Sequence, residues 1–290
     1  MTIAYRCDTG TVITNSSAAN RTISFPGTKP SAGDLVIVGG AGSGMGTTAP
    51  GITDNNGNGS YTIDKFSAHG GNNGDTLLAS HANVATGATF TLTITVGTAC
   101  YTALGAIAFS GAATSTPLDV LTESTHASGS ASSFSTDVSA TTAQADEVAI
   151  AVFSLANTIT VSTITASGYT IPIVSVNGAA SAVGAMGYQI LSATGTQQAT
   201  FVMGVASGAG TVGYCTIIAA YKGAVGTNAT GAISSVLESF TAVFSGSVSA
   251  TGTISSQLGN ATLSASGSGG VGGIFGMFGN LSIHRIGFGL

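Results

Sequence analysis

Charged residues are scarce in this sequence. Six lysines and arginines and 11 aspartates and glutamates stand among 290 residues, giving a formal net charge of −5. Charged side chains make up 6% of the chain, against about 25% in an average protein. The six basic residues are scattered, so we expect no nucleic-acid partner. So little surface charge favours self-association, which is typical of a subunit of an assembly.

Other features are also missing. Tryptophan is absent, and Cys7, Cys100 and Cys215 form neither a CxxC pair nor an even disulfide framework, so we expect buried thiols. No stretch of about 18 continuous apolar residues predicts a transmembrane helix. The first residues lack the basic start and apolar segment of a signal peptide. We therefore expect no membrane span and no signal peptide.

What remains is a chain of small and β-branched residues with strand periodicity. In ATFTLTITV, Phe90, Leu92, Ile94 and Val96 alternate with threonines. This period of two places the apolar residues on one face of a strand. Gly, Asn, Ser and Asp clusters separate such segments at short intervals, and no long amphipathic helix is evident. The pattern predicts an all-β protein.

An internal repeat divides the first 226 residues. Four segment pairs match in the same order at offsets of 108–113 residues: AGDLVI (32–37) with ADEVAI (145–150), NGSYTI (58–63) with ASGYTI (166–171), ATF (88–90) with ATF (199–201), and IAFSGA (107–112) with AAYKGA (219–224). We expect two repeated halves, about 20–115 and 133–226, that pack as sheet on sheet. The prediction is a large antiparallel, jelly-roll-like β-sandwich over 1–226.

Residues 227–290 have a different pattern. The segments 231–247 and 252–268 match at an offset of 21 residues, in a region rich in Ser, Thr and Gly. The tail that follows is apolar, and we expect this region to mediate oligomerisation or docking on a particle. The candidate assembly residues are Ile274, Phe275, Phe278, Ile283, Ile286 and Phe288.

A glycine-rich stretch follows the apolar run 35–38. Gly39 and Gly44 have the glycine spacing of a P-loop, but Met45 stands where the phosphate-binding lysine is required. A dinucleotide-binding loop would have to open a helix, and Pro50 and Gly51 prevent one there. Nucleotide binding is not expected, and no cofactor is predicted. We interpret residues 39–51 as an elaborated loop.

The next stretch, DNNGNGSYTIDK, partly matches a calcium-binding loop. The candidate cation ligands are Asp54, Asn56, Asn58 and Asp64. Lys65 occupies the position of the bidentate glutamate, so the alternative is a hairpin turn at Asn-Gly, and no metal is predicted. If the sandwich contacts a partner, these two loops are where we expect it, and the candidate binding residues are Ser43, Met45, Asn55, Asn58 and Tyr61.

Catalytic patterns are not evident. The four histidines have no zinc-site spacing, and no G-x-S-x-G motif occurs. Asp119 and Glu123 are close in sequence but lie in a Ser/Thr-rich segment, where solvated charges are the default interpretation. We predict that the chain is not an enzyme. Hydrolysis of a polysaccharide stays open only if two carboxylates converge in a groove.

The order of these segments resembles bacteriophage virion proteins with a large β-sandwich domain. The resemblance covers about residues 1–226. It depends on the Gly-Asp-Leu-Val-Ile strand (33–37), the tyrosine-containing hairpin, the Pro-Leu-Asp segment (117–119) and the closing Tyr-Lys-Gly (221–223). No catalytic residue is among them. The resemblance implies a structural protein of the virion.

Two functions follow as hypotheses. The first is a virion structural protein, namely a tail fibre, spike or surface decoration. It would associate with other virion proteins and with copies of itself, for which a trimer is the candidate oligomer. The resemblance implies assembly in the bacterial cytoplasm and location on the virion. The alternative is a receptor-binding module on the same fold, whose loops attach to a host-surface glycan.

Overall fold

The computed structural model describes most of the chain as two compact units. The described residues are 2–14, 20–68, 74–97, 100–126, 132–155, 162–175, 183–204 and 214–224, and four short strands between residues 233 and 266. The first unit spans Met1–Ala224 and the second spans Val225–Leu290. Every element of the described residues is a β-strand. Among these residues, no helix could cross a membrane.

The first half of the larger unit contains nine strands, which follow the predicted periodicity. Leu92 and Ile94 are fully buried, whereas Thr95 is exposed, so the alternation predicted for this segment is confirmed. The strands are β1 (Ala4–Asp8), β2 (Val12–Thr14), β3 (Asn20–Ser24), β4 (Leu35–Ser43), β5 (Gly51–Asp54), β6 (Thr62–Ser67), β7 (Asp75–His81), β8 (Thr91–Thr95) and β9 (Tyr101–Ser110).

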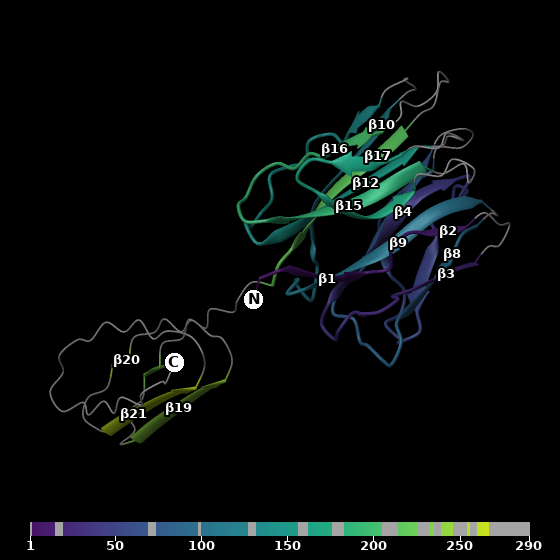
Figure 1. The fold of residues 1–290 in the computed structure, drawn as a ribbon. Helices are drawn as coiled ribbons and strands as arrows, with labels where there is room; N and C mark the ends of the chain where they lie inside the picture. Colours follow the sequence, from purple (N-terminus) through teal and green to yellow (C-terminus); the bar gives the residue numbers. More distant parts are fainter. Residues whose placement is uncertain are drawn as a thin grey trace. The chain divides into compact units, whose positions relative to one another are not determined.

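The second half contains eight strands. They are β10 (Leu118–His126), β11 (Ser133–Ser135), β12 (Glu147–Leu155), β13 (Ile164–Ala166), β14 (Thr170–Ser175), β15 (Val183–Leu191), β16 (Thr200–Met203) and β17 (Tyr214–Lys222). The purple-to-blue first half and the teal-to-green second half lie against each other in Figure 1. Each structural half begins earlier than the sequence repeat, because β1 and β10 open equivalent sheets.

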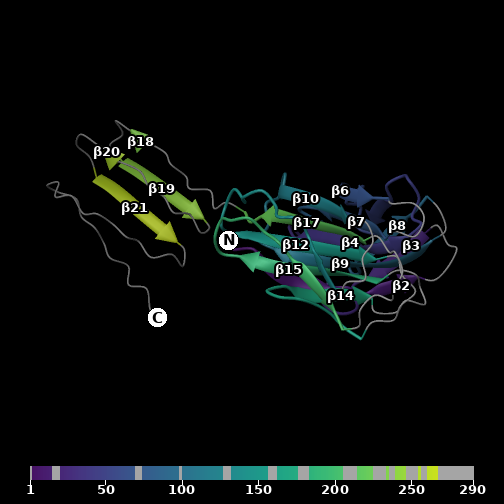
Figure 2. The same cartoon turned by 90° about the horizontal axis from the view of Figure 1, so that it is seen from above.

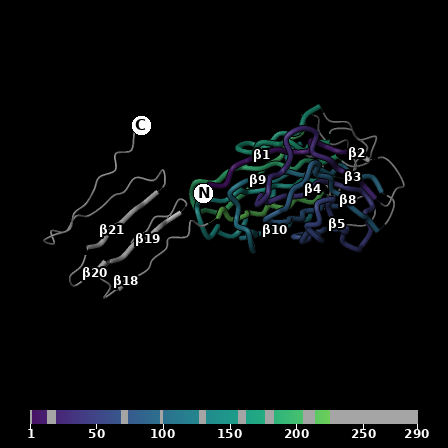
Figure 3. The backbone as a smooth tube through the Cα atoms, turned by 90° about the horizontal axis from the view of Figure 1, so that it is seen from below, coloured from purple at the N-terminus to yellow at the C-terminus, as the bar shows by residue number. Residues whose placement is uncertain are grey.

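The two halves have the same topology. The larger sheets are ordered β1-β9-β4-β7-β6, with β2 also paired to β9, and β10-β17-β12-β15-β14. The smaller sheets are ordered β3-β8-β5 and β11-β16-β13; β3 and β8 lie side by side in Figure 3. The chain alternates between a larger and a smaller antiparallel sheet, as in a jelly roll. The all-β, antiparallel sandwich is therefore confirmed, and each half is itself a two-sheet sandwich.

β-Bulges recur at equivalent edge strands of the two halves. The pairing register shifts between Tyr5 and Cys7 in β1, and between Leu118 and Val120 in β10. It shifts again between Ile63 and Lys65 in β6, and between Thr170 and Ile173 in β14. Bulges redirect side chains and terminate pairing at sheet edges. These matched irregularities support duplication independently of the sequence matches.

Three apolar cores hold four layers together. One core lies between the two sheets of the first half, and another between the two sheets of the second half. The third joins the larger sheets across the halves, through residues such as Ile37 and Ile107 on one side and Ile150 and Ile217 on the other. β12 packs against β4 and β7 across this core, and β12 and β4 are drawn close together in Figure 2. β4 and β12 are therefore buried on both faces, which explains their uninterrupted apolar runs.

The loop predicted for residues 39–51 is wrong in its first part. Gly39, Gly40 and Gly42 lie inside β4, which continues to Ser43 before the chain turns. A Cβ atom on Gly39 would lie 2.8 Å from the Leu77 carbonyl oxygen and 2.8 Å from the Met186 Sδ of the second half. Gly39 therefore has a packing role, because the backbone of neighbouring β7 and a side chain of the second half leave no room for a Cβ atom.

The second unit contains two pairs of parallel strands. β18 (Ile233–Ser234) pairs with β20 (Ile254–Ser255), and β19 (Ser239–Ser245) pairs with β21 (Asn260–Ser266). Every residue in these ladders pairs with the residue 21 positions later. Equivalent positions of the two 21-residue repeats therefore pair with each other in these parallel ladders.

Candidate functional site

The Asn/Gly turn between β5 and β6 is organised around Asp54. One carboxylate oxygen accepts hydrogen bonds from the Asn56 N–H at 2.8 Å and the Asn58 N–H at 3.4 Å. The other accepts from Asn58 Nδ2 at 2.9 Å and from the Tyr61 hydroxyl at 3.0 Å. Protein donors thus occupy the oxygens that a cation would need.

Asparagine side chains tie this turn to the loop between β7 and β8. Asn58 Nδ2 donates to the Ala85 carbonyl at 3.0 Å, and the Ala85 N–H donates to Asn58 Oδ1 at 2.6 Å. Asn55 likewise accepts from the Thr91 N–H at 2.8 Å and donates to the Thr89 hydroxyl at 2.9 Å. The asparagine side-chain amides thus form hydrogen bonds with backbone groups of the neighbouring loop, as a paired strand would, and connect the two loops at this end of the first half.

The four candidate cation ligands are not brought together. Asp64 lies in the β6 bulge and accepts a hydrogen bond from the Tyr221 hydroxyl at 2.7 Å, away from the donor set around Asp54, Asn56 and Asn58. Burial raises the pKa of Asp64, and the hydrogen bond from Tyr221 opposes this rise. In the part of the chain that the structure describes, no group of three or more His, Cys, Asp and Glu side chains is arranged to hold a metal ion.

The candidate binding residues differ in exposure. Asn55 is exposed, whereas Ser43 and Asn58 are half-buried. Met45 is fully buried, and its N–H donates to the buried Asp75 carboxylate at 2.6 Å. Tyr61 is 4% exposed, so its ring is not a surface on which a sugar could stack. The candidate assembly residues Ile274, Phe275, Phe278, Ile283, Ile286 and Phe288 lie outside the described residues.

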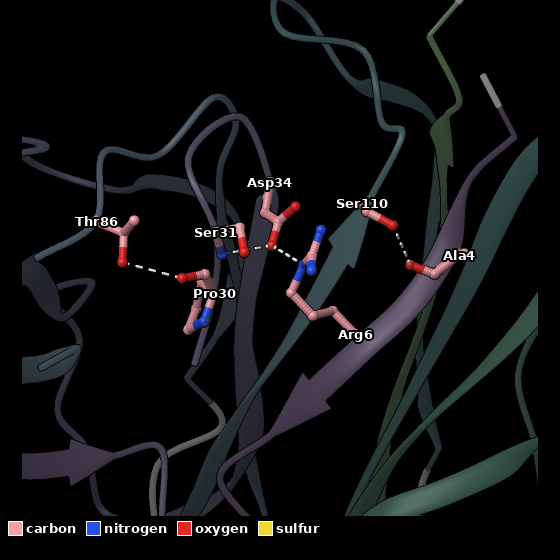
Figure 4. A network of polar contacts seen from close by, with 7 residues as sticks. All are labelled: Ala4, Arg6, Pro30, Ser31, Asp34, Thr86 and Ser110. Carbon is pink, nitrogen blue, oxygen red and sulfur yellow. Dashed lines mark hydrogen bonds and ion pairs between the residues drawn. The ribbon is translucent and has the colours of Figure 1, made fainter. Parts of the chain in front are cut away.

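A buried acid precedes the central strand in each half, as the AGDLVI/ADEVAI match requires. In the first half, Asp34 accepts from the Ser31 N–H at 2.7 Å and forms an ion pair with Arg6, the bulged residue of β1 (Figure 4). Asp34 is 2% exposed. The guanidinium compensates the buried charge, as a buried carboxylate requires.

The second half repeats this arrangement with the opposite charge at the bulge. Glu147 is fully buried, and its Oε1 accepts from the Gln144 N–H at 3.2 Å. The bulged residue of β10 is Asp119, which hydrogen-bonds Glu147. Burial, and then the Asp119 charge, raise the pKa of Glu147 to about 7, while nearby Lys222 opposes the rise. Glu147 Oε2 has no donor partner. Glu147 therefore binds a proton more readily than an exposed glutamate does.

Polar contacts also cross the seam between the halves. Lys65 forms an ion pair of 2.5 Å with Glu123, and the Thr76 hydroxyl donates to Cys215 Sγ at 3.0 Å. Burial raises the pKa of the Cys215 thiol to about 11. Because the thiolate is the reactive form, this cysteine is a packed thiol. These contacts hold the halves in register and provide no activated nucleophile.

An aromatic pair that the sequence analysis missed lies across the same seam. The rings of Tyr5 and Tyr188 are stacked with centroids 5.2 Å apart and an interplanar angle of 1°. Tyr5 is 41% exposed, and its hydroxyl donates to the Asp8 carboxylate at 2.7 Å. No local pattern could indicate this pair, because its members are 183 positions apart and meet only when the larger sheets pack.

No protein-family model matches this sequence, and neither the curated proteins nor the solved structures contain a significant match. Functional inferences for this chain therefore depend on its own residues and their geometry.

Proposed function

We propose that this chain is a structural protein of a bacteriophage particle, displayed as a tail appendage or surface decoration. The observation that supports this most is the pairing of a rigid double jelly roll with a separate unit of stacked parallel repeats. The sequence resemblance to virion proteins points in the same direction. Jelly rolls occur in viral capsids and in lectins, so the fold alone does not decide between display and recognition.

The chemistry of the sandwich supports a structural role. Three of its acids bind protein groups and not an outside partner. Asp54 accepts hydrogen bonds from its own turn, Asp34 forms an ion pair with Arg6, and Glu147 hydrogen-bonds Asp119. Few charges remain for a surface of this size. We infer that such a scaffold functions by assembling into a larger structure. The second unit is the candidate region for that assembly.

Location on a particle tests the proposal. Particles purified from a culture that produces the chain are probed with gold-labelled antibodies against the sandwich, and particle peptides are identified by mass spectrometry. We expect labelling at a defined position on the particle. Detection of the chain only in the particle-free fraction would contradict the proposal.

A host-surface glycan is the second candidate partner, and the Tyr5–Tyr188 pair favours it. Exposed aromatic rings offer apolar surface with a polar edge, and the neighbouring Asp8 carboxylate adds a hydrogen-bond acceptor. The Asn/Gly turn gives less support, because Tyr61 is buried and the amides are paired with backbone.

If the tyrosine pair binds a sugar, the sandwich should bind members of a glycan array. Tyr5→Ala should weaken that binding about fivefold, since removing a stacked ring costs on the order of 1 kcal/mol. Tyr101→Ala is the matched control, because Tyr101 is equally exposed at 41%. Unchanged binding by Tyr5→Ala would exclude the pair as the site.

A further inference from the structure

The strands of the second unit leave backbone edges that no described strand occupies. β19 and β21 pair along one edge each, and so do β18 and β20. A two-stranded sheet is marginal in water, and parallel strands normally lie inside larger, covered sheets. Stacked repeats also need further repeats or caps to bury their faces. Among the described residues, each of these four strands therefore has one edge without a paired strand.

The repeat itself identifies what fits on that edge. β21 pairs with β19 in parallel and in register over seven residues, from Ser239 with Asn260 to Ser245 with Ser266. The segments that form β19 and β21 are two copies of one 21-residue pattern. The outer edge of β21 is thus equivalent to the edge of β19 that β21 already covers, and β19 of another chain can pair there in the same way.

Charge does not oppose this pairing. Natural edge strands are usually protected by lysine, proline or a bulge. The strands β18, β19, β20 and β21 contain no charged residue and no proline, and their ladders have no register shift.

We propose that the second unit joins copies of this chain by strand addition, with β21 of one copy pairing in parallel and in register with β19 of the next. The partner is a second copy of the chain. This inference rests on the assembly role proposed above and specifies its geometry.

The size of the sandwich limits the number of copies. Each chain adds two rungs, or about 10 Å, to such a stack. A unit of 224 residues has a radius of gyration of about 17 Å, equivalent to a sphere about 45 Å across. Each sandwich is therefore wider than the spacing of the stack, so that crowding between sandwiches opposes its growth. We expect a short oligomer of the full-length chain.

Mixed cysteine variants of the full-length chain test this geometry. Thr241→Cys and Thr262→Cys are purified separately, mixed, and oxidised. In register, position 262 of one copy lies about 4.8 Å from position 241 of the next, within the Cα range of a disulfide. Identical positions of neighbouring copies are about 10 Å apart, so we expect at least about tenfold more disulfide dimer in the mixture than in either variant alone.

The matched control shifts the register by two residues. Thr241→Cys mixed with Ser264→Cys should give little dimer, because diagonal neighbours are about 8 Å apart. The native cysteines are all buried, which keeps the background low. A monomeric full-length chain, or a Thr262→Cys dimer formed without the partner variant, would overturn the inference. If particle labelling succeeds but the mixed variants do not cross-link, the proposed structural role is supported and only the β19–β21 pairing between copies is contradicted.

Discussion

Replacing Gly184 by alanine should lower the free energy of unfolding of the sandwich by about 3 kcal/mol, the upper range for an overpacked core. A Cβ atom there would overlap the Phe153 carbonyl oxygen and lie 2.5 Å from the Ala41 Cβ of the first half. Neither the backbone nor Ala41 can move without separating the larger sheets. In thermal unfolding the loss corresponds to roughly 6–12 °C for a unit of this size.

Gly51→Ala is the matched control for that experiment. Gly51 lies in β5, is exposed, and would place its Cβ atom in open space, so we expect a change within about 0.5 kcal/mol. Equal stabilities for the two variants would mean that the halves are not packed as closely as the structure has them.

The acid pair should make the sandwich less stable as the pH rises from about 4.5 to about 7. Glu147 titrates near 4.5 when unfolded and at about 7 in the fold, so the folded state binds the additional proton over this interval and stability falls with increasing pH. The full difference is about 3 kcal/mol, to be measured by urea unfolding at pH 4.5 and pH 8. Burial also raises the pKa of Asp64, which contributes with the same sign.

Glu147→Gln isolates the contribution of the pair. Glutamine keeps the shape and cannot ionise, so the variant should exceed the natural chain in stability at pH 8 by up to about 3 kcal/mol. At pH 4.5 the two chains should have nearly equal free energies of unfolding. The pH dependence that remains in the variant should come from the other acids, among them Asp64. Identical pH profiles for the two chains would exclude a raised pKa at Glu147.

The two halves offer a reciprocal exchange as a further control. Asp119→Arg gives the second half an ion pair with Glu147 like that of Arg6 with Asp34, and should remove most of the decrease in the free energy of unfolding at pH 8. Arg6→Asp gives the first half an acid pair with Asp34 and should lower the free energy of unfolding at pH 8 by a comparable amount. These opposite outcomes follow from the same bulge position in β1 and β10.

Local patterns were sufficient to predict the fold class and the duplication. The alternation around Leu92 and Ile94 predicts a half-buried strand because it depends only on neighbouring residues. The Asn-Gly stretch forms the predicted turn, but the predicted hairpin is wrong, because β5 pairs with β8 and β6 pairs with β7 in the other sheet. The segment matches at offsets of 108–113 residues indicate the duplication, because the matching segments form equivalent strands in the two halves.

Features that depend on packing between segments far apart in the sequence could not be predicted. The glycines of β4 resemble a loop in sequence, and only the close approach of the Leu77 backbone in β7 and of Met186 in the second half explains Gly39 inside a strand. Met45 lies in the predicted loop but is buried and bound to Asp75. Asp119 and Glu147 are 28 positions apart and look like ordinary solvated acids in the sequence. They meet only because β10 and β12 pair with the two edges of β17.

The most direct test of the central claim, that a self-sufficient sandwich carries a separate assembly unit, is the molar mass of two chains in solution. Light scattering on residues 1–290 and on a chain ending at residue 226 compares them at equal concentration. The sandwich has its own three cores, so we predict a folded monomer for the shorter chain and an oligomer of a few copies for the full one. An oligomeric short chain, or a monomeric full-length chain, would contradict the account.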